Sequence, residues 1–438
     1  MMGRIVLIVY CGILLLLFPL SGFSKEAKAD PVRGLREKAL AGEKESAFFL
    51  ADAYFYGKNV RKNPVLAAYW YRIAAQKGVV EAQYNLACCL ESGSGCRSDP
   101  AEAFAWYRKA AQQQFAPAML RMFHFYRTGL KGPDGKEMVT PSLSKGIALL
   151  RTLSAKGHPE AQILLAGTLL RKGSTEKEQK EAFTLLQFLS SKPEVPGVVL
   201  RMLSDCYYGG LGCEKNPEKT VSLLRKAAAK KDPEAVAKLG FLLEYGLCGL
   251  AIDLQEAFVC YRQSALLGHP LGQWKYAEHL YRSAAGKKDA VLKALKWYRR
   301  SASQECVQAL HFLGGICREG IPGILKKDLK KAAGCFFRAA KSGYAPSQYE
   351  LARMFQNKQI HNRVDNEAAF YWFLQAAIQG HLPSIHQAAE CYLEGRGVER
   401  SYVNGMRLLR AAAEKGDYEA ARRLQSLRLA EEYSGAGF

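Results

Sequence analysis

Residues 81–114 carry an apolar pattern that predicts two short helices. In the first half, small or apolar residues fall on one helical face, at Ala82, Leu86, Ala87 and Leu90. Gly93 and Gly95 then interrupt the pattern, and Ser98-Asp99-Pro100 supplies an N-cap followed by a proline at a new helix start. The face of the second helix is formed by Ala103, Phe104, Tyr107, Ala110 and Ala111. We therefore expect a helix–turn–helix unit.

Looser copies of this unit fill most of the chain. Helices of about 12 residues are marginal in water when isolated, so the copies must stack to bury their apolar faces. The close of each second helix recurs every 36 to 38 residues, except for one interval of 43 that contains the extra loop 131–136. The closing pairs are Ala74-Ala75, Ala110-Ala111, Leu153-Ser154, Leu189-Ser190, Ala227-Ala228, Ser264-Ala265, Ser301-Ala302, Ala339-Ala340, Ala376-Ala377 and Ala412-Ala413.

These intervals predict the domain organisation. Ten repeats occupy residues 43–416, a lead-in segment occupies 30–42, and a capping helix with a short tail occupies 417–438. Two places depart from the pattern: a polar turn at Lys172–Lys177 replaces Gly-x-Gly, and the fifth repeat begins late, near Gly197. We expect the array to bend or flex there.

The order of small residues, Gly-x-Gly, aromatic pair and Ala-Ala resembles the SLR (Sel-one-like repeat) family, which is related to tetratricopeptide repeats. The resemblance covers residues 43 to about 430. It implies an all-α fold, a right-handed superhelical α-solenoid of about ten repeats. Aromatic pairs at a fixed place in the second helices are expected in the core between repeats: Trp70-Tyr71, Trp106-Tyr107, Trp297-Tyr298 and Trp372-Phe373.

The N-terminus has the pattern of an export signal. Arg4 precedes an apolar run from Ile5 to Leu20, and Ala27-Lys28-Ala29 matches a small-x-small cleavage site. About 16 apolar residues are few for a membrane span and suit the core of a signal peptide. We expect residues 1–29 to be a signal peptide of a periplasmic or secreted bacterial protein. An uncleaved membrane anchor is the alternative.

The chain is strongly basic, with a formal net charge of +21. Its basic residues often come in pairs at helix ends and loops, as at Lys230-Lys231 and Lys287-Lys288. Such charges solvate a surface and complement helix dipoles. In an exported protein they also favour anionic lipid, cell-envelope polymer or acidic protein over nucleic acid.

Motifs for catalysis, cofactors and metals are missing from the sequence. The eight histidines do not cluster, and neither His-Glu-x-x-His nor Gly-x-Ser-x-Gly occurs. Residues 129–136 do not fit a phosphate loop, and Cys306 with His311 lacks a third group. We therefore expect no enzyme activity, cofactor, metal or small-molecule substrate.

Two cysteine pairs share one place in their repeats. Cys89 with Cys96, and Cys206 with Cys213, each join the end of a first helix to the residue after Gly-x-Gly. In an oxidising compartment each pair could form a disulfide. Apolar packing of two small side chains across the turn is the other interpretation.

The tetratricopeptide resemblance implies an inner, concave surface lined by the first helices. Its aromatic and arginine side chains either bind a partner or pack against each other inside the superhelix. They are Phe55, Tyr84, Arg127, Tyr208, Phe241, Tyr245, Trp274, Tyr281, Tyr349 and Arg353. The resulting hypothesis is an exported scaffold that binds protein partners on this surface. The alternative is a protein that binds anionic glycan or lipid of the cell envelope through its positive charge.

Overall fold

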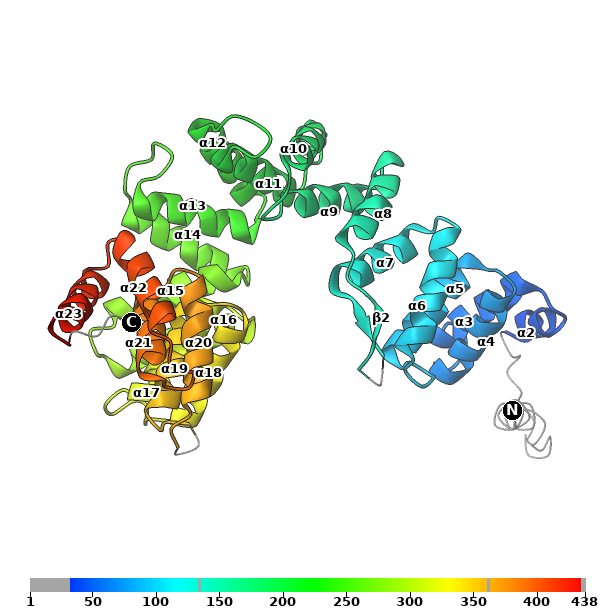
Figure 1. Cartoon of the computed structure of the whole chain (residues 1–438). Coiled ribbons are helices and arrows are strands. Elements are labelled where there is room, and N and C mark those ends of the chain that lie inside the picture. Colours follow the sequence, from blue (N-terminus) through cyan, green and yellow to red (C-terminus); the bar gives the residue numbers. More distant parts are fainter. Residues whose placement is uncertain (1–31, 133–134, 361–362, 435–438) are drawn as a thin grey trace, which may run out of the picture. The chain divides into compact units, whose positions relative to one another are not determined.

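The computed structural model describes residues 32–132, 135–360 and 363–434 (Figure 1). The described residues form two compact units, one ending at Ser174 and one beginning at Thr175. This boundary falls in the polar turn where the sequence analysis expects bending or flexing. The expected signal peptide, 1–29, lies outside the described residues.

The first unit contains a lead-in helix and the helices of the first repeats. They are α2 (Arg33–Leu40), α3 (Lys44–Tyr56), α4 (Pro64–Gln76), α5 (Val80–Ser92), α6 (Pro100–Gln112), α7 (Ala116–Thr128), α8 (Leu143–Ala155) and α9 (Pro159–Leu169).

The second unit continues the alternation of first and second helices. Its helices are α10 (Glu176–Ser190), α11 (Gly197–Gly209), α12 (Pro217–Ala229), α13 (Pro233–Tyr245), α14 (Leu254–Leu266), α15 (Pro270–Ser283), α16 (Lys288–Ser303), α17 (Val307–Glu319), α18 (Leu329–Lys341), α19 (Ala345–Gln356), α20 (Asn366–Ile378), α21 (Leu382–Glu394), α22 (Tyr402–Glu414) and α23 (Tyr418–Ser434).

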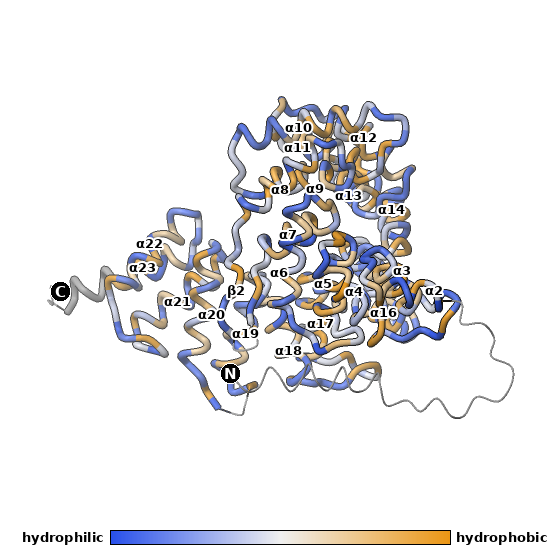
Figure 2. Tube along the Cα trace, turned by 90° about the vertical axis from the view of Figure 1, so that its right-hand side faces the viewer, coloured by the Kyte–Doolittle hydropathy of each residue, from blue (hydrophilic) through white to orange (hydrophobic). Residues whose placement is uncertain are grey.

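This order confirms an all-α repeat architecture. From α3 to α22 first and second helices alternate, and within each unit every helix packs against its neighbours in sequence. Figure 2 shows apolar and polar residues mixed along the helices and mostly polar connecting loops. In the part of the chain described here, none of the helices is both long and apolar enough to span a membrane.

The extra segment of the third repeat differs from the expected loop. Strand β1 (Leu130–Lys131) pairs antiparallel with β2 (Glu137–Val139), with Leu130 opposite Val139. The Gly132 amide also donates to the Lys136 carbonyl at 2.8 Å. Strands β1 and β2 therefore form a small antiparallel hairpin.

The Gly-x-Gly turn has two separate physical roles. Gly93 ends α5 in the left-handed region, with φ 72°. Gly95 also has a positive φ, and a Cβ there would lie 1.9 Å from the carbonyl oxygen of Pro64 in the preceding second helix. The corresponding glycines Gly212 and Gly397 contact backbone of Gln179 and Asn366 in the same way. The second glycine therefore lets each turn touch the repeat before it.

The aromatic pairs form the expected core, with one correction. The second member of each pair is fully buried, and Trp70 and Trp106 are buried as well. Trp297 and Trp372 are only half-buried. Trp297 packs against the ring of Tyr276 at 5.4 Å, while Arg300 covers it at 4.7 Å, so this tryptophan closes the edge of the core.

Candidate functional site

Exposed aromatic side chains gather on three consecutive first helices of the second unit. Tyr208 on α11 is 50% exposed, and Phe241 and Tyr245 on α13 are 43% and 52% exposed. Trp274 on α15 is half-buried. We call these four residues the aromatic groove. Exposed aromatic side chains of this kind are the usual anchors of protein interfaces.

Two neighbouring hollows are lined by three of these side chains, Tyr208, Phe241 and Trp274, while the ring of Tyr245 lies 4.8 Å from that of Phe241. The first, of about 220 Å³, is lined by Tyr208, Phe241 and Leu224 among others. The second, of about 140 Å³, is lined by Phe241, Leu271 and Trp274. Phe241 and Lys238 border both hollows, so the two lie next to each other along α13.

Close helix packing holds the groove in place. A Cβ at Gly240 would lie 3.1 Å from side-chain atoms of Cys260 and Tyr261 on α14. A Cβ at Gly272 would lie 2.2 Å from the Ser264 hydroxyl, which donates to the Pro233 carbonyl at 2.7 Å. Both first helices therefore pack directly on α14. The aromatic side chains start from fixed backbone, which lowers the entropy that binding costs.

Paired charges frame the groove. The Lys238 ammonium lies 2.8 Å from both carboxylate oxygens of Asp205 and 2.9 Å from Glu234. The Lys275 ammonium lies 3.1 Å from Glu244 and 3.3 Å from Glu278. These pairs link α11 to α13 and α13 to α15. Each cation has carboxylate partners, so the groove presents little free positive charge.

Burial and the paired charges shift the pKa values of these groups in opposite directions, and at Asp205 burial outweighs Lys238, so its pKa is raised. Burial pulls the pKa of Lys275 down, but the hydrogen bond to Glu244 and the charge of Glu278 outweigh it, so the pKa is raised. Burial raises the pKa of Glu234, yet hydrogen bonding and charge from Lys238 leave it below its usual value. Burial, with help from Glu244, strongly raises the pKa of Tyr261, whose hydroxyl donates to Glu244 at 2.6 Å.

Three aromatic residues expected on the inner surface pack against other rings. Tyr84 lies 5.6 Å from the rings of both Tyr107 and Phe115. Tyr281 lies 5.1 Å from Phe312. Tyr349 follows the same pattern, 5.7 Å from Phe373 and 5.4 Å from His381. All three are half-buried, so they fill space between helices.

Neither of the two arginines lines the hollows of the aromatic groove. Arg127 is exposed on α7 in the first unit, 5.8 Å from the ring of Phe123. Arg353 is exposed on α19, 5.8 Å from the ring of Tyr349.

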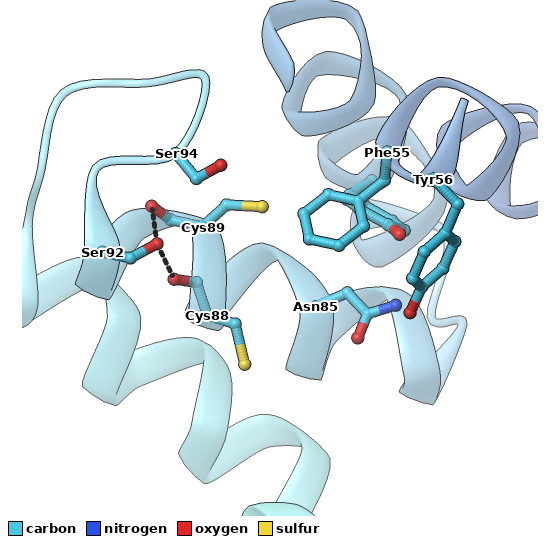
Figure 3. Close-up of a pocket in the computed structure, with 8 residues that line it drawn as sticks. Phe55, Tyr56, Asn85, Cys88, Cys89, Ser92 and Ser94 are labelled. Atoms are coloured by element: carbon cyan, nitrogen blue, oxygen red, sulfur yellow. Dashed lines mark hydrogen bonds between the residues drawn. The ribbon is translucent and has the colours of Figure 1, made fainter. Parts of the chain in front are cut away.

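A separate cavity lies in the first unit, between α3 and α5. It measures about 170 Å³ and is lined by Phe55 and Tyr56 on one side and Asn85 and Cys88 on the other (Figure 3). Ser92 also lines the cavity, and its hydroxyl donates to the Cys88 carbonyl at 2.8 Å. Phe55, another residue expected on the inner surface, thus borders this cavity.

The paired cysteines are thiols in this structure. Cys89 and Cys206 are buried, and Cys96 and Cys213 are half-buried. Burial, together with the neighbouring thiols, raises the pKa of Cys89 to about 12. Burial, together with the nearby Cys213, also raises the pKa of Cys206 to about 12. Disulfide formation stays a prediction.

Sequence reasoning missed the residues that complete the groove, chiefly Lys238, Lys275 and Leu271. The two lysines are 37 residues apart and occupy one repeat position, so their spacing was a usable signal. Nothing in the sequence marked Leu271 as a groove residue. The described residues contain no cluster of three or more His, Cys, Asp or Glu that could hold a metal.

Comparison with models of known protein families assigns this chain to a family. The model of the Sel1 repeat matches nine segments: 44–79, 80–115, 159–191, 199–232, 233–269, 270–306, 307–344, 345–381 and 383–417. The chain belongs to the Sel1 repeat family. The third helix pair, which carries the β1–β2 hairpin, lies outside the matched Sel1 repeats. The matched family is a structural repeat, which makes this chain a Sel1 repeat scaffold.

Known Sel1 repeat relatives come from fungi and bacteria. The chain is 26% identical over 256 residues to the chitin synthase regulator SKT5 of Saccharomyces cerevisiae, covering 58% of this chain and 32% of the regulator. It is 29% identical over 266 residues to an uncharacterized protein of Neisseria meningitidis, covering 60% and 52%. The chain thus spans a third to a half of these two relatives.

Among solved structures, the chain is similar to c5321, a protective antigen of uropathogenic Escherichia coli with an SLR fold. The sequence identity is 24%, the TM-score is 0.47, and the match covers 91% of this chain and 90% of the antigen.

Proposed function

We propose that this Sel1 repeat protein is an exported, non-catalytic scaffold that binds a protein partner in the aromatic groove. The observation that carries the proposal is the pair of neighbouring hollows that share Phe241 and Lys238 and are lined by residues of α11, α13 and α15. Exposed rings on fixed helices supply apolar area to a partner, and the ion pairs around them supply a polar rim.

The partner is a protein segment with apolar or aromatic side chains. The charges that border the groove are already neutralised by each other. Apolar burial therefore supplies the affinity, and the ion pairs set orientation. One relative, SKT5, is named as the regulator of an enzyme, which supports a role in which this scaffold positions or controls another protein.

Export is the second part of the proposal, and it rests on the sequence of residues 1–29. A bacterial envelope also offers anionic glycan and lipid, which the net charge of +21 would attract. That alternative predicts binding that salt abolishes, because exposed charges are screened over roughly 8 Å at physiological ionic strength. Binding in the aromatic groove predicts retention in high salt.

The experiment is site-specific photo-cross-linking in cells. A benzophenone amino acid replaces Phe241 in one variant and Tyr371 in another. Tyr371 is a matched control, because it is 53% exposed on the second helix α20. Position 241 should give a discrete protein adduct and position 371 should not. Adducts at both positions, or at neither, would reject the groove as the binding site.

Affinity for the cross-linked partner then tests the individual rings. Tyr245→Ala and Trp274→Ala should each weaken binding at least about fivefold, roughly 1 kcal/mol. Tyr371→Ala should leave affinity unchanged. Circular dichroism and melting curves distinguish loss of binding from loss of structure. Cleavage of the signal is checked by mass spectrometry of the secreted or periplasmic protein.

A further inference from the structure

The second helices of two neighbouring repeats, α16 and α18, carry an unusual density of positive charge. Residues 287–341 contain thirteen lysines and arginines against four acidic residues. In α16 the only acidic residue is Asp289. The exposed cations of the two helices are Lys288, Lys293, Lys296, Arg299, Arg300, Lys330, Lys331, Arg338 and Lys341, which we call the basic face.

A cleft opens in the basic face. It measures about 510 Å³ and is lined by residues of α16, α17 and α18. Arg299, Lys331 and Arg338 contribute cationic side chains to its wall, while Leu295, Leu313 and Leu325 contribute apolar surface. A recess with a few polar groups around an apolar interior is the usual form of a ligand site.

The cations of the cleft differ in how well they are neutralised. Arg338 lies 2.6 Å from Glu305 and also donates to the Ala302 carbonyl at 2.9 Å. Lys331 lies 3.0 Å from Asp328. Arg299 has neither an ion pair nor a hydrogen bond with any residue that the structure describes. The cleft therefore offers a free guanidinium, which suits a carboxylate.

Gly334 keeps the wall of the cleft open. It lies inside α18, where glycine is less favourable than alanine by roughly 0.5–1 kcal/mol. A Cβ at this position would meet no atom within 4 Å, so no close contact between helices requires the glycine. The space in front of it is available to a ligand.

We propose that the cleft binds an acidic peptide segment that carries one aliphatic side chain. The aliphatic side chain contacts the half-buried Leu325, Cys317 and Cys335 above the buried Leu295 and Leu313, and carboxylates pair with Arg299 and with the cations along α16. That helix has 16 residues, or about 24 Å of length, which corresponds to about seven extended peptide residues. A flat lipid surface does not reach the recessed leucines, and a purely polar glycan leaves them without an apolar partner.

The binding test uses fluorescence anisotropy with the full-length chain. The probe is a labelled heptapeptide of six glutamates around a central leucine. One control peptide has serine in place of leucine, and another has glutamines in place of glutamates. Either replacement should weaken binding at least tenfold. Equal binding of the leucine and serine peptides overturns the inference.

Variants of the chain locate the bound peptide. Gly334→Leu fills the cleft without a steric clash at Cβ and should weaken binding at least tenfold. Gly315→Leu is the matched control on α17, because its Cβ also meets no atom within 4 Å. Arg299→Gln should weaken binding severalfold, whereas Lys226→Gln on α12, which removes the same charge elsewhere, should not. Unchanged affinity in Gly334→Leu overturns the proposal.

Two further measurements separate this inference from its competitors. Phosphatidylglycerol vesicles test the membrane alternative, and tighter binding to them than to the heptapeptide overturns the peptide assignment. Trp274→Ala tests independence from the aromatic groove, and it should leave heptapeptide affinity unchanged. Failure at the groove and failure at the basic face are therefore distinguishable.

Discussion

Replacing Trp106 by alanine tests how the repeats are held together. Trp106 is 8% exposed in α6, and its indole nitrogen donates to Glu102 at 3.1 Å. Glu102 also pairs with Arg72 on the second helix of the previous repeat. The substitution removes the buried ring and one hydrogen bond, while the bond between Glu102 and Arg72 remains.

The expected cost follows from the buried area. A buried tryptophan removes about 200 Å² from water, which at about 25 cal/mol per Å² corresponds to about 5 kcal/mol. Residual burial in the unfolded chain lowers this to about 3–4 kcal/mol, within the usual range for tryptophan-to-alanine changes. Trp297 is only half-buried, so Trp297→Ala should cost about 2 kcal/mol.

Hydrogen exchange with mass spectrometry is the suitable assay, because a repeat array in two units need not unfold in one step. In Trp106→Ala, amides of α5 to α7 should exchange roughly two to three orders of magnitude faster. Amides of α15 to α17 should not change. Phe188→Ala, at a 55% exposed aromatic residue, is the control. Acceleration below tenfold in Trp106→Ala would show that the ring contributes little to the core.

Three further predictions follow from buried groups and turns. Gly95→Ala should cost about 3 kcal/mol or more, because the overlap of its Cβ with the Pro64 carbonyl adds to the αL strain of about 1–2 kcal/mol. Gly78→Ala, at positive φ with no atom within 4 Å, should cost the αL strain alone, so equal costs measured by hydrogen exchange would contradict this. Burial lowers the pKa of His311, as it does those of His124, His269 and His381, from an ordinary value near 6.5. The unfolded chain therefore binds these protons at a higher pH than the folded chain does. Lowering the pH from 7.5 to 5.5 should lower the urea midpoint of unfolding, and the decrease should be smaller in His311→Gln. A midpoint independent of pH would be inconsistent with neutral buried rings. With the pKa of Cys89 and Cys206 raised to about 12, iodoacetamide at pH 8 should spare both in the folded chain, and labelling at the rate of an unfolded thiol would contradict their burial. Protection that persists in urea and ends on reduction would identify the predicted disulfides.

The repeat architecture was predictable because each signal in the sequence has a local cause. An Asp or Asn before proline caps each of several second helices, as Asp99 does by accepting from the Ala101 and Glu102 amides at 3.0 Å. The hairpin at 130–139 was not predictable, because Gly132–Lys136 reads as a loop and its strands are only two and three residues long. The half-burial of Trp297 depends on Tyr276 and Arg300, and its repeat position alone gives no indication of that.

The candidate site was predictable only in part, for a related reason. Repeat position identifies which residues leave the first helices on the same side, and Tyr208, Phe241, Tyr245 and Trp274 do come together. It does not reveal whether a neighbouring ring covers them. Tyr84, Tyr281 and Tyr349 each meet an aromatic residue or histidine from the following helices, and these side chains close the space around them.

The two surfaces of the second unit should therefore respond differently to salt. Around the aromatic groove, Lys238 and Lys275 already lie about 3 Å from carboxylates, so a partner there gains little from their charge and loses little when salt screens it. On the basic face, Arg299 has no acidic partner in the described residues, and its neighbours on α16 face one acidic residue in their own helix. An acidic partner there gains attraction that salt removes. A partner that dissociates from the parent chain at high salt, and that also cross-links through position 241, would contact both surfaces. If affinity falls as cations of the basic face are removed, and Tyr245→Ala leaves affinity unchanged, the binding belongs to the basic face alone.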